Sequence, residues 1–354
     1  MVINNYRRMQ MESYLFPSII ESNNYEIRNV ASDLLHGLKF YEDDLGYIIG
    51  YLALSEGVAP GKAINSFPND LEYKLLAKAG LLISYAKNNS PKNLVTGFPY
   101  SIYHVNKSKA EDLLNGTHQI TFDPAPFEKS GLTQMITTKV NNVEVMPEIE
   151  ACTIAARKGE LRKEDNFFIV SIGYGTLEAC LSTEKGLVYR TITSLVGLNY
   201  AVNLTIKEIS KSFYLGLRTE HQFDVAFKEG KIILNRQELD ISQIRKRSLE
   251  RYYTDIISPY LRNAWKDDDF KNTKSLLLTG GGSLYSDLVD CFKKDFDFLN
   301  VQIVPNPLTF ASEGYCIRSL ENSNGDKDAA LGIDIGNSTT VVTLFPKKGE
   351  VVES

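Results

Sequence analysis

The chain has 354 residues, of which 43% are hydrophobic and 23% are charged, and its formal net charge is −5. This length is enough for two ordinary domains with cores of their own, and the composition is typical of a globular protein. The acidic balance argues against direct binding to nucleic acid or to an anionic membrane surface.

Targeting and redox features of the sequence favour the cytoplasm. No uncharged apolar run approaches the length of about 18–20 residues that a spanning helix needs, and the first residues lack the apolar core of a signal peptide. Four widely spaced cysteines, with no paired metal-ligand spacing, are expected to be reduced thiols; they are Cys152, Cys180, Cys291 and Cys316. We therefore expect a cytoplasmic protein that does not bind membranes.

The N-terminal part of the chain alternates strand-forming and helix-forming stretches. The predicted elements are strands at 11–20, 47–52 and 93–99 and a helix at 71–86. The first strand enters a turn at Pro17, and the last is stopped by Gly97 and Pro99. This order of elements is typical of an α/β layer.

A crossover is predicted at 142–156, where a short strand is followed by a helix that starts near Pro147. Proline suits the first helical turn, and the positive end of the helix stabilises the adjacent Glu148. Glu148 is therefore either a functional carboxylate or a simple N-terminal helix charge, and Glu150 is its local alternative.

The middle of the chain predicts a second hairpin and two helices. Residues 166–180 read as an apolar run, a corner at 173–176 and a returning strand. A helix is expected to follow the segment 195–199, and a longer one is expected at 241–266, where Pro259 should kink it.

The sharpest motif lies at 275–287, where a buried strand is followed by three glycines and the start of a helix. Three glycines let the backbone pass flush against a flat ring and bring helix N–H groups toward phosphates. The stretch is not a Walker loop, because no Gly-Lys-Ser/Thr follows, and it lacks the Gly-x-Gly-x-x-Gly spacing of dinucleotide folds. It predicts either a nucleotide-binding loop or a tight strand–helix turn.

The last stretch, 329–345, reads as a β-hairpin made of two strand-forming runs around a Gly/Asn corner. Asp334 stands between Ile333 and Ile335, so its carboxylate is expected in an apolar sheet, where it needs donors or a cation. The corner at 336–340 offers successive backbone N–H groups and hydroxyls that can hold phosphate oxygens. The alternative is an ordinary hairpin with a satisfied aspartate.

These stretches together resemble the actin, sugar-kinase and heat-shock-chaperone ATPase superfamily, and within it the ParM-type plasmid-segregating actins. Residues 331–340 are similar to the first phosphate loop, 170–178 to the second phosphate loop, and 276–287 to the adenosine motif. In that family the first phosphate loop opens the chain, whereas here it nearly closes it. The order of the motifs is rotated, so the resemblance implies a circular permutation.

The resemblance implies an α/β fold of two ribonuclease-H-like domains with ATP or ADP and Mg²⁺ in the cleft. Domain I would consist of 1–147 plus 309–354, and domain II of 148–308. Glu148 would orient the attacking water, and Asp334 would hold Mg²⁺ through water. The other implied nucleotide contacts are Gly336, Asn337, Ser338, Thr339, Thr340, Ser171, Gly173, Tyr174, Gly175, Thr176, Gly197, Lys228, Gly280, Gly281, Gly282, Ser283 and Phe310.

Two positions depart from the family's second phosphate loop. Ser171 stands where the family has an aspartate, and Glu178 replaces a second aspartate. An uncharged serine cannot hold the water shell of Mg²⁺ as a carboxylate does. We therefore expect this protein to hydrolyse ATP slowly.

The function implied by the resemblance is a nucleotide-dependent filament of identical subunits. Such a filament would move plasmid DNA through an adaptor protein, not by direct contact with nucleic acid. One alternative is an ATP-binding scaffold without hydrolysis, which Ser171 favours. The other is a small-molecule kinase of the same superfamily, which would need a further carboxylate motif near the γ-phosphate, and the sequence shows no such motif.

Overall fold

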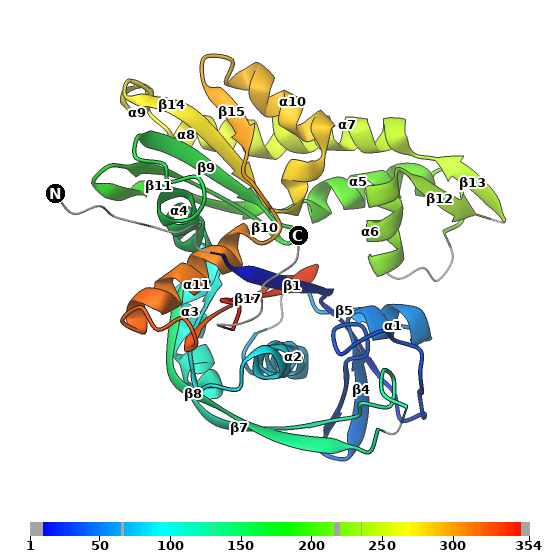
Figure 1. Cartoon of the computed structure of the whole chain (residues 1–354). Helices are drawn as coiled ribbons and strands as arrows, with labels where there is room; N and C mark the ends of the chain where they lie inside the picture. Colours follow the sequence, from blue (N-terminus) through cyan, green and yellow to red (C-terminus); the bar gives the residue numbers. More distant parts are fainter. Residues whose placement is uncertain (1–9, 65–66, 130, 216–219, 235, 348–354) are drawn as a thin grey trace. The chain divides into compact units, whose positions relative to one another are not determined.

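The computed structural model describes residues 10–64, 67–129, 131–215, 220–234 and 236–347 (Figure 1). The chain divides into two compact units. Unit 1 comprises Met1–Gly57, Ser66–Glu164 and Thr309–Ser354, and unit 2 comprises Val58–Asn65 and Asp165–Leu308. None of the helices in the described ranges combines the length and the apolar character that crossing a bilayer requires.

Unit 1 is built on one large mixed β-sheet. Its strands are β1 (Glu12–Pro17), β2 (Ile19–Ser22), β3 (Lys39–Glu42), β4 (Leu45–Ile49), β6 (Lys92–Phe98), β7 (Gly116–Phe122), β8 (Gln134–Pro147), β16 (Ala330–Ile335) and β17 (Thr339–Leu344). Its helices are α1 (Tyr51–Glu56), α2 (Leu71–Lys87), α3 (Tyr100–Leu114), α4 (Glu148–Lys158) and α11 (Phe310–Asn322). These strands follow the order β1-β17-β16-β6-β8-β7-β3-β4-β2.

The C-terminal hairpin β16–β17 lies inside this sheet. β17 runs antiparallel to β1, with Thr343 opposite Ser13, and β16 runs parallel to β6, with Gly332 opposite Val95. Five large apolar side chains of the hairpin are at most 2% exposed; they are Leu331, Ile333, Val341, Val342 and Leu344. Segments from the two ends of the sequence therefore form neighbouring strands.

Helices α2 and α11 cover opposite faces of the hairpin. On one face, a Cβ atom added at Gly80 of α2 would lie 2.9 Å from Ile333 Cδ1. On the other face, a Cβ atom added at Gly332 would lie 2.4 Å from the carbonyl oxygen of Ser312 in α11. Because residues two apart on a strand point to the same face, Asp334 lies on the α11 face together with Gly332.

Unit 2 is built on a five-stranded sheet with the order β11-β10-β9-β14-β15, and β12 and β13 form a separate hairpin. The strands of this sheet and hairpin are β9 (Asn166–Ile172), β10 (Thr176–Thr183), β11 (Gly186–Val196), β12 (Lys231–Leu234), β13 (Gln237–Asp240), β14 (Thr273–Thr279) and β15 (Asn300–Ile303). The short strand β5 (Gly61–Lys62) also belongs to unit 2. The helices are α5 (Asn199–Ser210), α6 (Glu220–Glu229), α7 (Ser242–Tyr252), a π-helical turn at Tyr253–Ile257, α8 (Ser258–Ala264), α9 (Asp267–Phe270), a 3₁₀ turn at Gly281–Leu284 and α10 (Ser286–Asp295).

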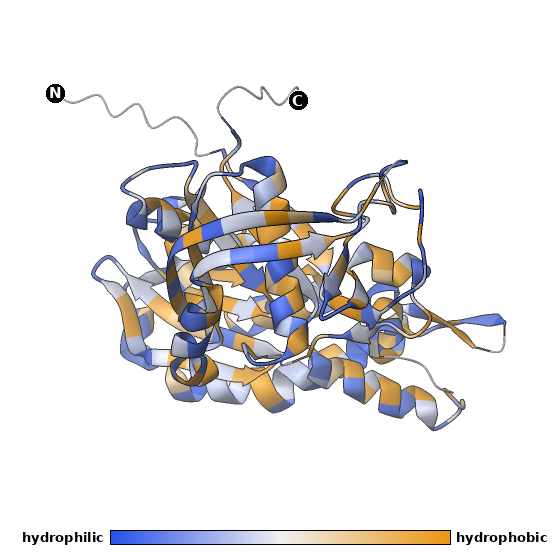
Figure 2. Cartoon of the chain, turned by 90° about the horizontal axis from the view of Figure 1, so that it is seen from below, coloured by the Kyte–Doolittle hydropathy of each residue, from blue (hydrophilic) through white to orange (hydrophobic). Residues whose placement is uncertain are grey.

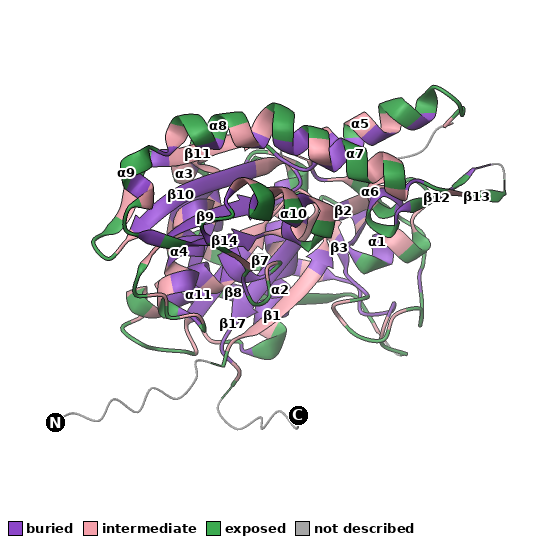
Figure 3. Cartoon of the chain, turned by 90° about the horizontal axis from the view of Figure 1, so that it is seen from above, coloured by how far each residue is buried: buried purple, intermediate pink, exposed green. Residues whose placement is uncertain are grey.

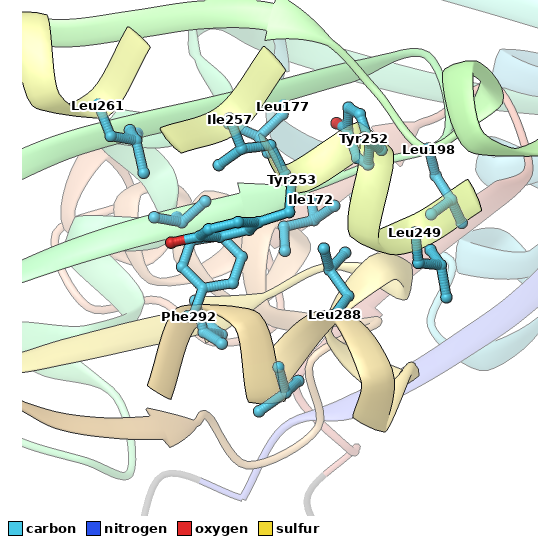
Figure 4. Close-up of a cluster of buried hydrophobic side chains, with 14 of the residues drawn as sticks. Ile172, Leu177, Leu198, Leu249, Tyr252, Tyr253, Ile257, Leu261, Leu288 and Phe292 are labelled. Atoms are coloured by element: carbon cyan, nitrogen blue, oxygen red, sulfur yellow. The ribbon is translucent and has the colours of Figure 1, made fainter. Parts of the chain in front are cut away.

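The core of unit 2 lies between this sheet and three of its helices. Figure 4 shows side chains of β9 and β10 packed against side chains of α7, α8 and α10. The central strands β9 and β14 run parallel and are buried along nearly their whole length (Figure 3). The helices alternate hydrophobic and hydrophilic bands (Figure 2), as expected of helices that cover a sheet with one face.

Two element predictions are wrong in detail. The strand predicted at 47–52 ends at Ile49, because Gly50 takes a left-handed φ of 64° and α1 starts at Tyr51. The helix predicted at 241–266 is interrupted by the π-helical turn that precedes Pro259. A proline has no N–H to donate to the helix ladder, so the backbone before it adjusts.

The division into units differs from the predicted domain boundaries at two places. Helix α4 packs against α11, so the chain leaves unit 1 after Glu164 and not after Pro147. Residues 58–64 fall in the predicted domain I, but they belong to unit 2. Both differences arise from contacts between segments that are distant in sequence.

Candidate functional site

Two carboxylates of unit 1 lie at the carboxyl ends of β16 and β8, the two strands that flank β6. β6 lies between β16 and β8, and it is in register with Gly332 on one side and with Pro147 on the other. Asp334 lies two residues after Gly332, and Glu148 directly follows Pro147 as the first residue of α4. Ligands of α/β sheets bind at this edge, outside the carboxyl ends of parallel strands.

The carboxylates of Asp334 and Glu148 are close enough to repel each other. Asp334 is half-buried as a residue, but its carboxylate is enclosed by protein atoms. Burial, and after it the charge of Glu148, hold the pKa of Asp334 well above its usual range. Protonated Asp334 therefore stabilises the folded state relative to its ionised form. This stability is fully present at low pH and is lost as the pH rises through the raised pKa. A cation beside the pair would favour the ionised form.

Glu150, the alternative to Glu148, faces different charges. Burial raises the pKa of Glu150, Arg318 lowers it, and Glu144 raises it. Arg318 Nε also donates to a carboxylate oxygen of Glu144 at 3.0 Å. Glu148, and not Glu150, is thus the carboxylate whose charge acts on Asp334.

The corner of the C-terminal hairpin is fastened by Ser18, which lies between β1 and β2. The Ser18 N–H donates to the carbonyl oxygen of Ser338 (3.0 Å), and its hydroxyl donates to that of Gly336 (2.6 Å). The hydroxyls of Ser18 and the buried Thr340 are 2.9 Å apart. Thr340 therefore supports the loop, whereas the predicted contacts Asn337, Ser338 and Thr339 are half-buried. Ser18 is not among the predicted contacts, although it follows the turn at Pro17.

The second phosphate loop of unit 2 is docked on the start of α5. The N–H groups of Leu198 and Asn199 donate to the carbonyl oxygens of Gly173 (3.0 Å) and Tyr174 (2.9 Å). The N–H of Gly197 donates to the carbonyl oxygen of Gly175 at 2.9 Å. A Cβ atom at Gly197 would lie 2.5 Å from the Thr176 nitrogen, so only glycine permits this approach. The structure thus brings together Gly173, Tyr174, Gly175, Thr176 and Gly197, five of the residues that the resemblance implies as nucleotide contacts.

A buried lysine, Lys62, which is not among the predicted contacts, touches the same loop. Lys62 Nζ lies 3.3 Å from the ring centre of Tyr174 and 2.8 Å from a carboxylate oxygen of Asp224 on α6. The Lys62 side chain is 2% exposed. Burial, and next the charge of Asp224, also raise the pKa of Tyr285, which follows the glycine loop. Asp224 therefore lies near both loops of unit 2.

Lys228 does not join this group. It lies one turn after Asp224 on α6 and is exposed, while its carbonyl oxygen accepts a hydrogen bond from Arg245 (3.0 Å). The side chain of this helix that pairs with Lys62 is that of Asp224.

The three glycines of the adenosine motif have different surroundings. Gly280 has a φ of 78°, and its carbonyl oxygen accepts the hydroxyl of the buried Ser283 at 2.7 Å. A Cβ atom at Gly282 would lie 2.2 Å from Cγ2 of Ile172, so this glycine is required by the core of unit 2. A Cβ atom at Gly281 would meet only Leu308, at 3.6 Å. Gly281 is the glycine of this loop that presents an open face.

Phe310, the last predicted contact, is the first residue of α11 in unit 1 and is 3% exposed. Its ring is therefore part of the packing of unit 1.

The sequence of residues 2–148 matches the family model "Actin like proteins N terminal domain". No curated protein is similar to this chain in sequence at a significant level.

Several solved structures have the same fold. A non-polymerisable mutant of the pCBH ParM matches with a TM-score of 0.69 and 21% identity, over 87% of this chain and 92% of that one. A subunit of a 15-stranded ParM filament from Clostridium botulinum matches with a TM-score of 0.69 and 20% identity, over 86% and 92%. An archaeal actin homologue in complex with ADP matches with a TM-score of 0.61 and 15% identity, over 85% and 90%. Residues 2–148 are therefore similar in sequence to the N-terminal domain of actin-like proteins, and the chain has the fold of ParM and of the archaeal actin homologue.

Proposed function

We propose that this protein binds ATP with Mg²⁺ and assembles with copies of itself into filaments that respond to the bound nucleotide. The observation that carries the proposal is the pair Asp334 and Glu148, held beside a glycine corner at the carboxyl ends of parallel strands. Two similar proteins support it: one is a ParM filament, and another is an actin homologue in complex with ADP.

The residues present fit Mg²⁺ that is held mainly through water and phosphate oxygens. Within the described ranges, no group of three or more His, Cys, Asp or Glu side chains could hold a metal ion directly. Mg²⁺ keeps several of its waters and binds through one or two carboxylates plus substrate phosphates. The raised pKa of Asp334 favours its protonated form, and the charge of a nearby cation would lower that pKa and favour the carboxylate that Mg²⁺ requires. When bound, Mg²⁺ would neutralise charge on the phosphates.

Each chain group has a distinct part in the proposed hydrolysis. Asp334 would hold the water shell of the metal, and Glu148 would orient the attacking water. Backbone N–H groups of the corners at 336–340 and 173–176 would bind phosphate oxygens, and Gly281 would lie against the base. A scaffold that binds ATP without hydrolysing it remains the second candidate, favoured by the serine at position 171.

We also infer that the chain is a circular permutant of its family. The support is the position of β16–β17, which come last in the sequence but lie between β1 and β6 in the sheet. The family resemblance places the corresponding hairpin first. Plasmid DNA reached through an adaptor protein is the proposed cargo, since a net charge of −5 disfavours direct contact with DNA.

If the proposed function is correct, the protein will sediment as filaments when ATP and Mg²⁺ are present. It will return to the supernatant when the ATP is used up. Centrifugation and negative-stain microscopy with ATP, with ADP and without nucleotide measure this directly. Asp334→Asn is the matched control, because it keeps the shape of the side chain and removes its charge, and it should not sediment. Binding of ATP without sedimentation in any nucleotide state would favour the scaffold.

The glycine loop provides a second test, of the nucleotide site alone. Gly281→Ala is expected to weaken ATP binding by at least about tenfold. The added methyl group would push the base away from the backbone at residue 281, and most of the van der Waals contact between them would be lost. Its melting temperature should stay near that of the wild type, because the added Cβ meets only Leu308 at 3.6 Å. Titration with a fluorescent ATP analogue and thermal unfolding measure both quantities.

The comparison variant is Gly282→Ala, whose Cβ would lie 2.2 Å from Ile172. It should lower the melting temperature of unit 2 and thereby separate a packing effect from a ligand effect. Unchanged nucleotide affinity in Gly281→Ala would show that the loop is only a tight strand–helix turn.

A further inference from the structure

The side chain of Tyr315 crosses the sheet of unit 1 on the face that α11 covers. Tyr315 lies on α11 and is fully buried. A Cβ atom added at Gly332 of β16 would lie 3.0 Å from Cβ of Tyr315, and one added at Gly97 of β6 would lie 2.1 Å from its hydroxyl oxygen. Gly332 is in register with Val95, which precedes Gly97 by two residues. The side chain therefore follows the strands toward their carboxyl ends.

The hydroxyl end of this side chain lies between the two strands that carry the acids. β6 is flanked by β16 and β8, and a Cβ atom at Gly97 would also lie 2.4 Å from the carbonyl oxygen of Met146 on β8. Asp334 and Gly97 each lie two residues after a paired residue of β16 and β6, and Glu148 lies two residues after Met146. Neighbouring strands are about 4.8 Å apart. The hydroxyl is therefore at the level of Asp334, one strand away from it and on the same face.

Close contacts on two sides fix α11 at this position. A Cβ atom at Gly332 would lie 2.6 Å from the backbone nitrogen of Cys316, so the helix backbone rests directly on β16. A Cβ atom at Gly314 would lie 1.9 Å from the carbonyl oxygen of Ala151 in α4. Tyr315 stands between Gly314 and Cys316 in the sequence, so the helix cannot shift without moving its side chain.

A hydroxyl at this position has the chemistry that an ionised Asp334 needs. The carboxylate of Asp334 is enclosed by protein atoms, and the negative charge of Glu148 acts on it. A tyrosine O–H can donate to a carboxylate oxygen without adding a further charge to the site. Hydrogen bonds to ionised acceptors are short and strong, so one such donor would fix where the carboxylate points.

We infer that Tyr315 is a positioning residue, whose hydroxyl donates to the carboxylate of Asp334 and holds it toward the water shell of Mg²⁺. This inference rests on the proposed function. Tyr315 acts through Asp334 and touches neither the metal nor the nucleotide. Gly97, predicted only as the end of a strand, then has the further role of leaving room for the hydroxyl.

Tyr315→Phe tests the inference, because it removes the hydroxyl and keeps the ring. ATP affinity is measured on the full chain with Mg²⁺ and with EDTA, using a fluorescent ATP analogue. The gain in affinity that Mg²⁺ provides should fall about tenfold, as expected for one hydrogen bond to a charged group, while the affinity in EDTA should change less than about twofold.

Tyr73→Phe is the matched control, and it should keep the full gain. Tyr73 of α2 is 1% exposed, and the charge of Asp334 acts on it as well. Its ring stacks on Phe98, which follows Gly97 on β6 and therefore points to the opposite face of the sheet. The control thus removes a similar buried hydroxyl that cannot donate to Asp334 from the α11 face.

A double-mutant cycle with Asp334→Asn separates positioning from packing. If the hydroxyl acts through Asp334, Asp334→Asn/Tyr315→Phe should bind ATP with Mg²⁺ as tightly as Asp334→Asn alone, within about twofold. A purely structural role of Tyr315 would lower the affinity equally in both backgrounds, and this result would overturn the inference.

The remaining outcomes also decide. A full Mg²⁺-dependent gain in Tyr315→Phe overturns the inference, and so does an equal loss with Mg²⁺ and with EDTA. If Tyr315→Phe fails to fold, as judged by thermal unfolding, replacing Tyr315 by a tyrosine fluorinated beside its hydroxyl makes the hydroxyl a stronger donor. The gain should then rise, and a gain that does not rise overturns the inference. A wild type that binds no ATP in either condition overturns the proposed function itself, and this inference with it.

Discussion

Ending the chain after Gly325 is expected to unfold unit 1. This truncation keeps α11 whole and removes β16 and β17, which lie between β1 and β6. Fully burying one large aliphatic side chain is worth about 1.5–3 kcal/mol. The hairpin buries five such side chains to 2% exposure or less, namely Leu331, Ile333, Val341, Val342 and Leu344. Their summed contribution is comparable to the whole stability of a typical domain, which is about 5–15 kcal/mol.

Hydrogen exchange of the amides in β6 and β8 measures this effect within unit 1. Trp265 reports separately on unit 2, where its ring stacks on Phe168 with 4.2 Å between ring centres. A chain ending after Lys347 is the matched control, because it keeps both strands of the hairpin. Native protection of β6 and β8 in the shorter chain would contradict the inferred permutation.

The elements that the sequence predicts well are those with strong local patterns. The helix expected at 71–86 is α2, and the strand expected at 93–99 is β6. Both hairpins occur where strand-forming runs flank glycine corners, at 166–180 and 329–345. In these stretches, hydrophobic periodicity and turn residues already determine the local structure, and packing only adds to it.

The register of paired strands could not be predicted from such local patterns. The hairpin at 166–180 was predicted, but the pairing of Ser171 with Glu178 depends on the length of the turn and on the first hydrogen bond after it. A hairpin closed by the bond from Gly173 to Thr176 fixes that pairing. The corner was therefore the signal that could have identified Glu178 as the partner of the serine.

Contacts between distant segments were out of reach. Lys62 and Asp224 form their ion pair across 162 positions of the sequence. Nothing local to Gly61–Lys62 distinguishes this lysine from a solvated one, since its burial is created by the packing of 58–64 within unit 2. The same applies to Asp224. Helical spacing shows which residues share a face with it, but only the fold shows that this face is turned inward.

The largest effect of a single substitution is expected at Gly314, in the middle of α11. A Cβ atom there would lie 1.9 Å from the carbonyl oxygen of Ala151 and 2.5 Å from its carbonyl carbon. These are backbone atoms of α4, which cannot move aside as a flexible side chain would. In an isolated helix Gly→Ala stabilises by about 1 kcal/mol, so the sign expected here is the reverse of the intrinsic preference.

Gly314→Ala is expected to lower the free energy of unfolding of unit 1 by about 3 kcal/mol, the upper part of the range for overpacking a core. For units of this size, this corresponds to a drop in melting temperature of about 6–12 °C. Because α4 begins with Glu148, a displaced α4 also moves this carboxylate relative to Asp334, so ATP hydrolysis should fall with stability. Thermal unfolding followed by circular dichroism measures the first effect, and phosphate release in a single turnover measures the second.

The same substitution at Gly281, where the added Cβ meets only Leu308 at 3.6 Å, is the control and should leave the melting temperature nearly unchanged. Equal melting temperatures for Gly314→Ala and the wild type would mean that α4 and α11 can separate without cost, and the close helix contact would then not be what positions Glu148.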